Sequence, residues 1–358
     1  FDAQTGWVRL HVSPRPDHSA QLSYTRQQAD EVLYPYLLMD GITDNADRLN
    51  LRYGIVRHGS LVSNVTARAY YSAVDHWMTD ERRVSSANMA REYSMATQAK
   101  AATGGGSVEA VVGGVTAGVE TYRRSWDAST MMAGSKYAPQ YTIPFATTDH
   151  VGVFADVERP IGDLTKIAAG GRFDYSRSEA DAARANTDLY FAYNGTRSVA
   201  VTDTGASGKV RVTRQLGSHV EIVAGLGRTF RVPDPQERYL ALKRMGADWV
   251  GNPSLRPTRN TGLQVSANYH ARRLLASASV SRDWLADYIT VRGQLKNSAV
   301  PGVMNTTARS YANVDARMLT GELSMTWPAT DRLFVTASGS VTRATKDTRP
   351  ESGLTSPN

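Results

Sequence analysis

Residues that could catalyse a reaction or hold a metal ion are few in this sequence. Its 358 residues include 7 His and 10 Met but no Cys. Disulfides, thiolate zinc sites and Cys nucleophiles are therefore excluded within this stretch. No Gly-x-Ser-x-Gly, His-Glu-x-x-His or P-loop motif occurs, and the glycines at 104–106 precede no helical pattern. The sequence predicts no catalytic residue and no bound cofactor.

His76 and Met78 have the side-chain types and the spacing of a site for a soft metal ion. They are two residues apart in a strand-like segment, so both point to one face of the strand. An imidazole and a thioether suit Cu(I) better than hard cations. The alternative is that an exposed methionine only packs within its loop and that a histidine at a strand end is an ordinary rim residue. Most other methionines fall in predicted long connections or at strand ends: Met39, Met89, Met95, Met131, Met132, Met245 and Met304.

A period of two dominates the local sequence. In 319–327 the odd positions are apolar or Gly, whereas the even positions are Thr, Glu and Ser. Such alternation predicts strands with one apolar and one polar face. The segments that fit are 6–13, 18–27, 46–57, 60–78, 91–103, 107–126, 146–159, 163–180, 200–215, 218–233, 258–271, 273–291, 307–327 and 331–347.

The connections between these segments alternate between short and long. Tight turns rich in Gly, Pro and Asp are predicted at 14–17, 57–59, 104–106, 160–163, 216–217, 271–272 and 328–330. Long connections are predicted at 28–45, 79–90, 127–145, 181–199, 234–257 and 292–306. Outer-membrane barrels have short turns at one end and long loops at the other, whereas propellers and solenoids repeat at a fixed period of about 20–50 residues.

The requirements of a lipid bilayer also favour a barrel built from these strands. No apolar stretch approaches the roughly 18 residues of a membrane helix. In lipid every backbone polar group must be paired, so a chain of strands can span only as a closed barrel. The sequence therefore predicts an all-β fold, a transmembrane antiparallel up-and-down β-barrel whose polar face lines the lumen.

A pattern in the second half is similar to TonB-dependent outer-membrane receptors. Residues 231–239 fit the Arg-x-Pro-x-x-x-Glu-x-Tyr with which a late strand ends in that family, and 251–257 fit its Gly-Asn-Pro-x-Leu-x-Pro before the next strand. The family's following Glu is Thr258 here, a minor departure. The resemblance implies energised import through a barrel of about 22 strands that is blocked by a plug.

The same resemblance implies a domain organisation, a location and partners. Residues 1–358 would be part of a single barrel domain, about 14 of its strands, with the N-terminal plug before residue 1 and the last strands after Asn358. The barrel would lie in an outer membrane of the Gram-negative type, surrounded by lipid and lipopolysaccharide. TonB and its inner-membrane energising complex would be its partners, through the missing N-terminal region.

A narrower resemblance lies in the first third. Residues 74–80 are similar to the Val-Asp-His-x-Met-x-Asp segment that closes an early strand in TonB-dependent copper receptors, where the His and Met bind copper. The resemblance implies His76 and Met78 as metal ligands, with copper as the transported substrate rather than a cofactor. In that group the other sulfur ligands come from the plug.

Two other functions stay open from the sequence. A siderophore or cobalamin receptor would bind a metal chelate with aromatic and Arg side chains, for which Tyr34, Tyr36, Tyr190, Tyr193 and Trp249 are candidates. A passive porin would carry a charged eyelet on an inward-folded loop and would have no plug. The 41 Lys and Arg against 34 Asp and Glu give a net charge of +7, but they are scattered, so no nucleic-acid partner is expected.

Overall fold

Long antiparallel strands make up most of the chain. The computed structural model describes residues 1–87, 93–132, 139–330 and 332–347. Its long strands are β1 (Asp2–Arg15), β2 (His18–Val32), β3 (Asp40–Val56), β4 (Val62–Thr79), β5 (Met95–Val112), β6 (Val115–Met132), β7 (Gln140–Ile161), β8 (Thr165–Glu179), β9 (Ala200–Leu216), β10 (Val220–Arg231), β13 (Thr258–Ala271), β14 (Leu274–Leu295), β15 (Thr307–Thr330) and β16 (Leu333–Lys346). Each pairs with its neighbours in chain order, which confirms the predicted all-β antiparallel fold.

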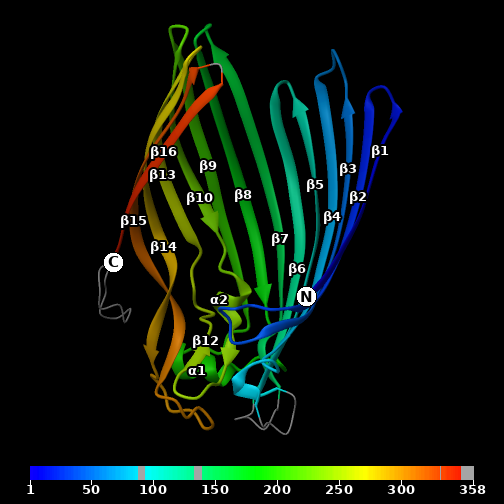
Figure 1. Ribbon diagram of the computed structural model, residues 1–358, viewed down its shortest axis with the longest axis vertical. Helices are drawn as coiled ribbons and strands as arrows, with labels where there is room; N and C mark the ends of the chain where they lie inside the picture. The colour runs from blue at the N-terminus through cyan, green and yellow to red at the C-terminus, as the bar shows by residue number, and fades with distance from the viewer. Residues whose placement is uncertain (88–92, 133–138, 331, 348–358) are drawn as a thin grey trace.

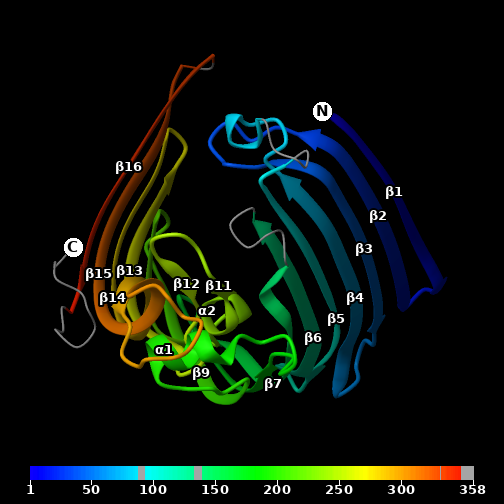
Figure 2. The ribbon, with the colours of Figure 1, turned by 90° about the horizontal axis from the view of Figure 1, so that it is seen from below.

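The sheet curls into an incomplete barrel (Figures 1 and 2). Among the described residues β1 pairs only with β2, and β16 only with β15, so the two edge strands do not meet. The hairpin turns gather at one end of the sheet and the long connections at the other, as the alternation of short and long connections predicts. The predicted strand at 91–103 begins at Met95, and its first two residues lie outside the described part of the chain.

The predicted turn at 104–106 is wrong, because β5 runs straight through these glycines. The hairpin lies instead at Gly113 and Gly114, whose φ angles of 56° and 76° suit a two-residue turn. Gly105 faces the inside of the sheet, where a Cβ atom would lie 2.7 Å from both the Tyr70 hydroxyl and the Tyr122 Cβ. The glycine is therefore needed to make room for two inward-facing tyrosines and not to turn the chain.

Substitution of Gly105 should distinguish these roles. We expect Gly105→Ala to lower the free energy of unfolding by about 1–3 kcal/mol, because the new methyl group overpacks the site. Gly171 is the matched control, since it also lies within a strand but a Cβ there meets nothing within 4 Å. Unfolding of the two variants in detergent measures the difference, and equal stabilities would contradict the crowding at Gly105.

The two faces of the sheet differ as the alternation predicts. Val119, Val153 and Phe173 are cross-strand neighbours on the outer face and are well exposed, as lipid-facing side chains would be. The inner face carries charges in the same strands. There Arg172 donates to Asp174 at 2.6 Å, and the same carboxylate lies 3.0 Å from His150 Nε2.

The long connections hold a few short elements that the sequence did not predict: η1 (Val84–Ser86), α1 (Thr187–Asn194), α2 (Pro235–Tyr239), β11 (Ala241–Leu242) and β12 (Asp248–Val250). Figure 2 shows α1, α2, β11 and β12 within the concave side of the sheet. None of the helices in the described ranges is long and apolar enough to cross a membrane.

The segment 232–257 is packed against the inner wall. Asp234 caps α2 in a capping box with Glu237. Tyr239 is fully buried in an apolar cluster with the wall residue Ile143, and its hydroxyl donates to the Ser178 carbonyl at 2.9 Å. The segment is thereby placed inside the lumen, next to the ends of β6 and β7 at which the long connections lie.

Candidate functional site: a methionine-lined pocket in the lumen

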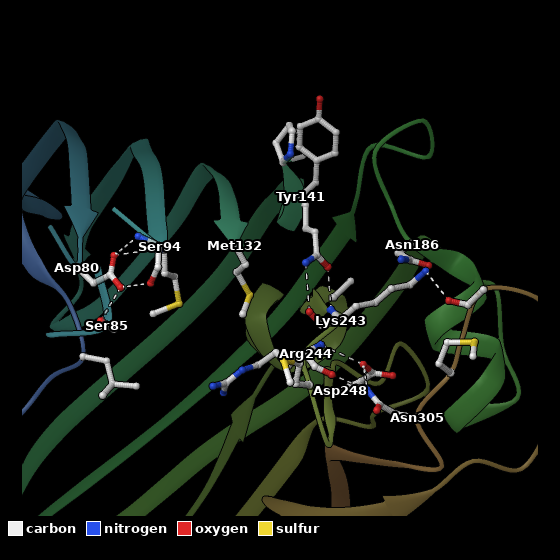
Figure 3. A pocket seen from close by; sticks show the side chains of 18 of the residues that line it. Asp80, Ser85, Ser94, Met132, Tyr141, Asn186, Lys243, Arg244, Asp248 and Asn305 are labelled. Carbon is white, nitrogen blue, oxygen red and sulfur yellow. Dashed lines mark hydrogen bonds between the residues drawn. The ribbon is translucent and has the colours of Figure 1, made fainter. Parts of the chain in front are cut away.

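A cavity of about 890 Å³ lies between the inner wall and the inward-folded connections (Figure 3). Four methionines line it from opposite sides. Met95 and Met132 belong to the wall, at the adjoining ends of β5 and β6, whereas Met245 and Met304 belong to the connections 240–257 and 296–306. Thioethers are soft donors that suit Cu(I) or a comparable soft cation better than a hard one.

The wall side of the pocket is held by a buried acid. Met95 and Met132 are directly opposite each other across β5 and β6. The Asp80 carboxylate accepts hydrogen bonds at 2.8 Å from the Met95 and Ser94 N–H groups and at 2.7 Å from the Ser85 hydroxyl. Burial would raise the pKa of Asp80, but these hydrogen bonds outweigh burial and lower the pKa below its usual value. Asp80 is therefore ionised near neutral pH and fixes the start of β5.

The opposite side of the pocket is built from α1 and the two connections. Tyr190 and Tyr193 of α1 are fully buried, and the Tyr193 hydroxyl donates to Asp248 at 2.8 Å. Burial, and after it this hydrogen bond, raises the pKa of Tyr193. Their buried positions leave Tyr190 and Tyr193 no surface for a metal chelate, which corrects their place among the candidate chelate-binding aromatics.

Basic side chains also reach the pocket. The Arg244 guanidinium stacks over the Trp249 ring, 4.4 Å from its centroid, and Lys243 Nζ donates to the Gly302 carbonyl at 2.9 Å. Arg184 is paired with Asp127 at 3.0 Å. The pocket thus combines soft donors with cationic groups, so it could also accept a negatively charged complex of a metal.

His76 and Met78 lie on the same inner face but do not line this pocket. Their strand β4 pairs with β5, and Met78 is opposite Thr97, two residues along β5 from Met95. Met78 and Met95 are therefore diagonal cross-strand neighbours, a relation that typically places residues about 7–8 Å apart. These neighbours form a continuous row on the inner wall: Met132, Met95, Met78 and His76.

His76 has a neighbour that suits a metal ligand. Its Nδ1 lies 3.6 Å from Asp44 Oδ2, and its side chain is 21% exposed. A carboxylate beside one imidazole nitrogen commonly orients a metal-binding histidine through the other nitrogen. Among the described residues no group of three or more His, Asp or Glu side chains gathers into a metal site. Around this row the described residues offer an imidazole, thioethers and the Asp44 carboxylate as donors.

Only some of the predicted loop methionines line the pocket. Those that do are Met95, Met132, Met245 and Met304, whereas Met39 and Met131 do not. Met89 lies outside the described residues. Sequence reasoning assigned no role to Asp80, Asp248 or Arg244. The role of Asp248 arises from contacts with distant connections, whereas the Asp80 carboxylate and the Arg244 guanidinium contact residues close to them in the chain. The only signal available was that methionines recur near the long connections.

Comparison with known proteins bears on the fold and the family. Residues 3–358 match the family model described as TonB dependent receptor-like, beta-barrel. No curated protein sequence matches the chain. Among solved structures, the copper transporter OprC aligns with a TM-score of 0.78 at 23% identity, covering 96% of this chain and 52% of that one.

Other similar structures are named for different cargoes. The Serratia marcescens hemophore receptor HasR aligns with a TM-score of 0.67 at 13% identity, covering 95% of this chain and 54% of HasR. The FrpB iron transporter of Neisseria meningitidis gives a TM-score of 0.68 at 14% identity, with coverages of 98% and 52%. At these identities the likeness shows the fold alone, and the chain spans about half the length of each structure.

The family model covers nearly all of the chain, and the fold, the two-faced strands and the placement of the connections all agree with it. Members of the family are outer-membrane β-barrels that act as transporters and receptors. The chain belongs to the TonB-dependent receptor β-barrel family of the outer membrane.

Proposed function

We propose that this protein imports copper across the outer membrane. The observation that carries the proposal is that four methionines line one lumenal pocket, next to a wall row that ends in Met78 and His76. Thioether and imidazole donors favour Cu(I) over iron, calcium or magnesium. His76 and Met78 are the proposed wall ligands of the final site, with Asp44 orienting the imidazole.

The proposal includes the parts of a TonB-dependent receptor outside this sequence. Residues 1–358 would form part of a single barrel domain, whose plug closes the lumen beside His76 and Met78. Movement of the plug, driven through TonB and its inner-membrane energising complex, would separate wall ligands from plug ligands and release the ion. Lipid and lipopolysaccharide would surround the outer face. Support comes from the family match and from the sheet, whose two edge strands do not pair with each other in the described part of the chain.

A metal chelate is the second candidate substrate, and a specific observation favours it. The pocket volume of about 890 Å³ falls in the usual range for sites that enclose a small molecule. Arg244, Lys243 and Arg184 give it the cationic groups that an anionic chelate requires. A bare soft cation would need the thioethers but not these basic residues, so the two substrates depend on different side chains of one pocket.

Uptake by cells tests the energised step. Cells that express the complete gene product should accumulate copper at low external concentration, and the gain should disappear when TonB is deleted or a protonophore is added. Offering copper as Cu(I) and as a preformed anionic chelate separates the two substrates. Accumulation that is independent of TonB would mean passive diffusion, as through a porin, and would overturn the proposal.

A further inference from the structure

Three long connections meet at the carboxylate of Asp248. This residue begins β12 and is only 1% exposed. Its Oδ1 accepts from the Asn305 amide at 2.7 Å and from the Arg244 N–H at 3.2 Å, and its Oδ2 accepts from the Tyr193 hydroxyl at 2.8 Å. Figure 3 shows Asp248 beside Asn305 and Arg244 at the edge of the pocket. One acid thereby joins the connections 180–199, 240–257 and 296–306.

The groups that Asp248 holds are next to the two loop methionines. Arg244 immediately precedes Met245, and Asn305 immediately follows Met304. The two methionine residues are 94% and 87% exposed, so packing does not fix their side chains. The Asn305 amide also donates to the Arg244 carbonyl at 2.6 Å, which ties the two connections directly. The positions of both methionine backbones therefore depend on the junction around Asp248.

The junction requires an acceptor at residue 248. The Asn305 amide and the Arg244 backbone N–H both donate to Oδ1, and the Tyr193 hydroxyl that donates to Oδ2 also lies 3.0 Å from the Asn305 carbonyl. An asparagine can keep all three contacts, because its amide oxygen accepts from the first two groups and its NH2 group donates to the hydroxyl oxygen. An alanine has no acceptor and would leave two buried donors unsatisfied. Asp248→Ala therefore breaks the junction, and Asp248→Asn is the conservative variant that should keep it.

We propose that Asp248 is a positioning residue for metal capture, which holds the backbones of Met245 and Met304 at the pocket that the wall methionines Met95 and Met132 also line. The inference rests on the proposed function, because it assumes that this pocket receives Cu(I). Preorganisation of donors is the physical reason for the effect: loops that are free to move apart must first be ordered before two thioethers can share one ion.

The test compares Cu(I) affinities of the complete gene product in detergent, by competition with a chromogenic Cu(I) chelator in the presence of ascorbate. Asp248→Ala should weaken binding about ten-fold or more, as is usual when a group that orients metal ligands is changed, whereas Asp248→Asn should bind like the unmodified protein. Asp188→Ala is the matched control, because this exposed acid pairs with Arg197 of the same connection and forms no ion pair with another connection in the described part of the chain. Its affinity should equal that of the unmodified protein.

A double-mutant cycle separates positioning from general loss of structure. The first arm is Asp248→Ala, and the second is Met245→Leu with Met304→Leu, which conserves volume. If Asp248 acts through these methionines, the combined variant should bind Cu(I) no more weakly than the methionine variant alone. Additive losses, a methionine variant with undiminished binding, or an Asp248→Ala variant that binds like the unmodified protein would overturn the inference and leave the proposed function standing, because His76 and Met78 are its proposed ligands. Absence of Cu(I) binding by the unmodified protein would overturn both.

Discussion

Replacing Arg238 by methionine is expected to cost about 3–5 kcal/mol of stability, because it leaves the carboxylate of Asp203 buried without its counter-ion. The Arg238 side chain is fully buried, and that of Asp203 is 5% exposed. The guanidinium donates to the two carboxylate oxygens at 2.7 and 3.0 Å and to the Leu255 carbonyl at 2.9 Å. These bonds join the inward-folded segment 232–257 to the wall strand β9.

The measurement is denaturant or thermal unfolding of the complete gene product in detergent, with limited proteolysis to report on the segment itself. Arg231→Met is the matched control, since Arg231 lies in the same part of the chain but is half exposed in its pair with Glu237 and should cost about 1 kcal/mol or less. Replacing both partners, Arg238→Met with Asp203→Leu, should recover most of the loss. Equal losses for Arg238→Met and Arg231→Met would contradict the role of the buried pair.

Replacing Met95 and Met132 together by leucine is expected to raise the copper concentration for half-maximal uptake about 10–100-fold, a range typical of damage around a metal site. Leucine conserves the volume of methionine but removes the thioether, so the wall should keep its packing. The maximal rate of uptake should stay the same, because the proposed ligands His76 and Met78 are unchanged.

Met318→Leu with Met325→Leu provides the control for this pair. Both of these methionines lie on β15 and neither lines the pocket. Kinetics of copper uptake by cells that express each variant give both parameters. A fall in the maximal rate with an unchanged half-saturating concentration would place Met95 and Met132 outside the capture step.

The strands could be predicted from the sequence because their signal is local. Alternation over 319–327 or 165–175 reports the two faces directly, since a strand places neighbouring residues on opposite sides. The glycines at 104–106 show the limit of that signal. Glycine is common both in turns and in crowded strand positions, and only the tyrosines on the neighbouring strands, Tyr70 and Tyr122, distinguish the two.

The pocket could not be predicted in the same way, because its parts come from connections far apart in the chain. Asp248 joins Tyr193 and Asn305, which are 55 and 57 residues away. The sequence did indicate that methionines recur near the long connections, and four of them line the pocket. It gave no indication that α1 and α2 fold into the lumen, nor that Tyr190 and Tyr193 are buried there.

The copper content of the purified complete gene product tests the central claim most directly. The protein is exposed to copper, freed of unbound metal and analysed, alongside a His76→Ala, Met78→Ala variant and the Met318→Leu, Met325→Leu control. We predict bound copper in the unmodified protein and in the control, and less bound copper in the His76 and Met78 variant, which keeps the pocket methionines. Equal copper in all three would remove His76 and Met78 from the site, and no copper in any of them would contradict copper binding and favour a metal chelate as the substrate.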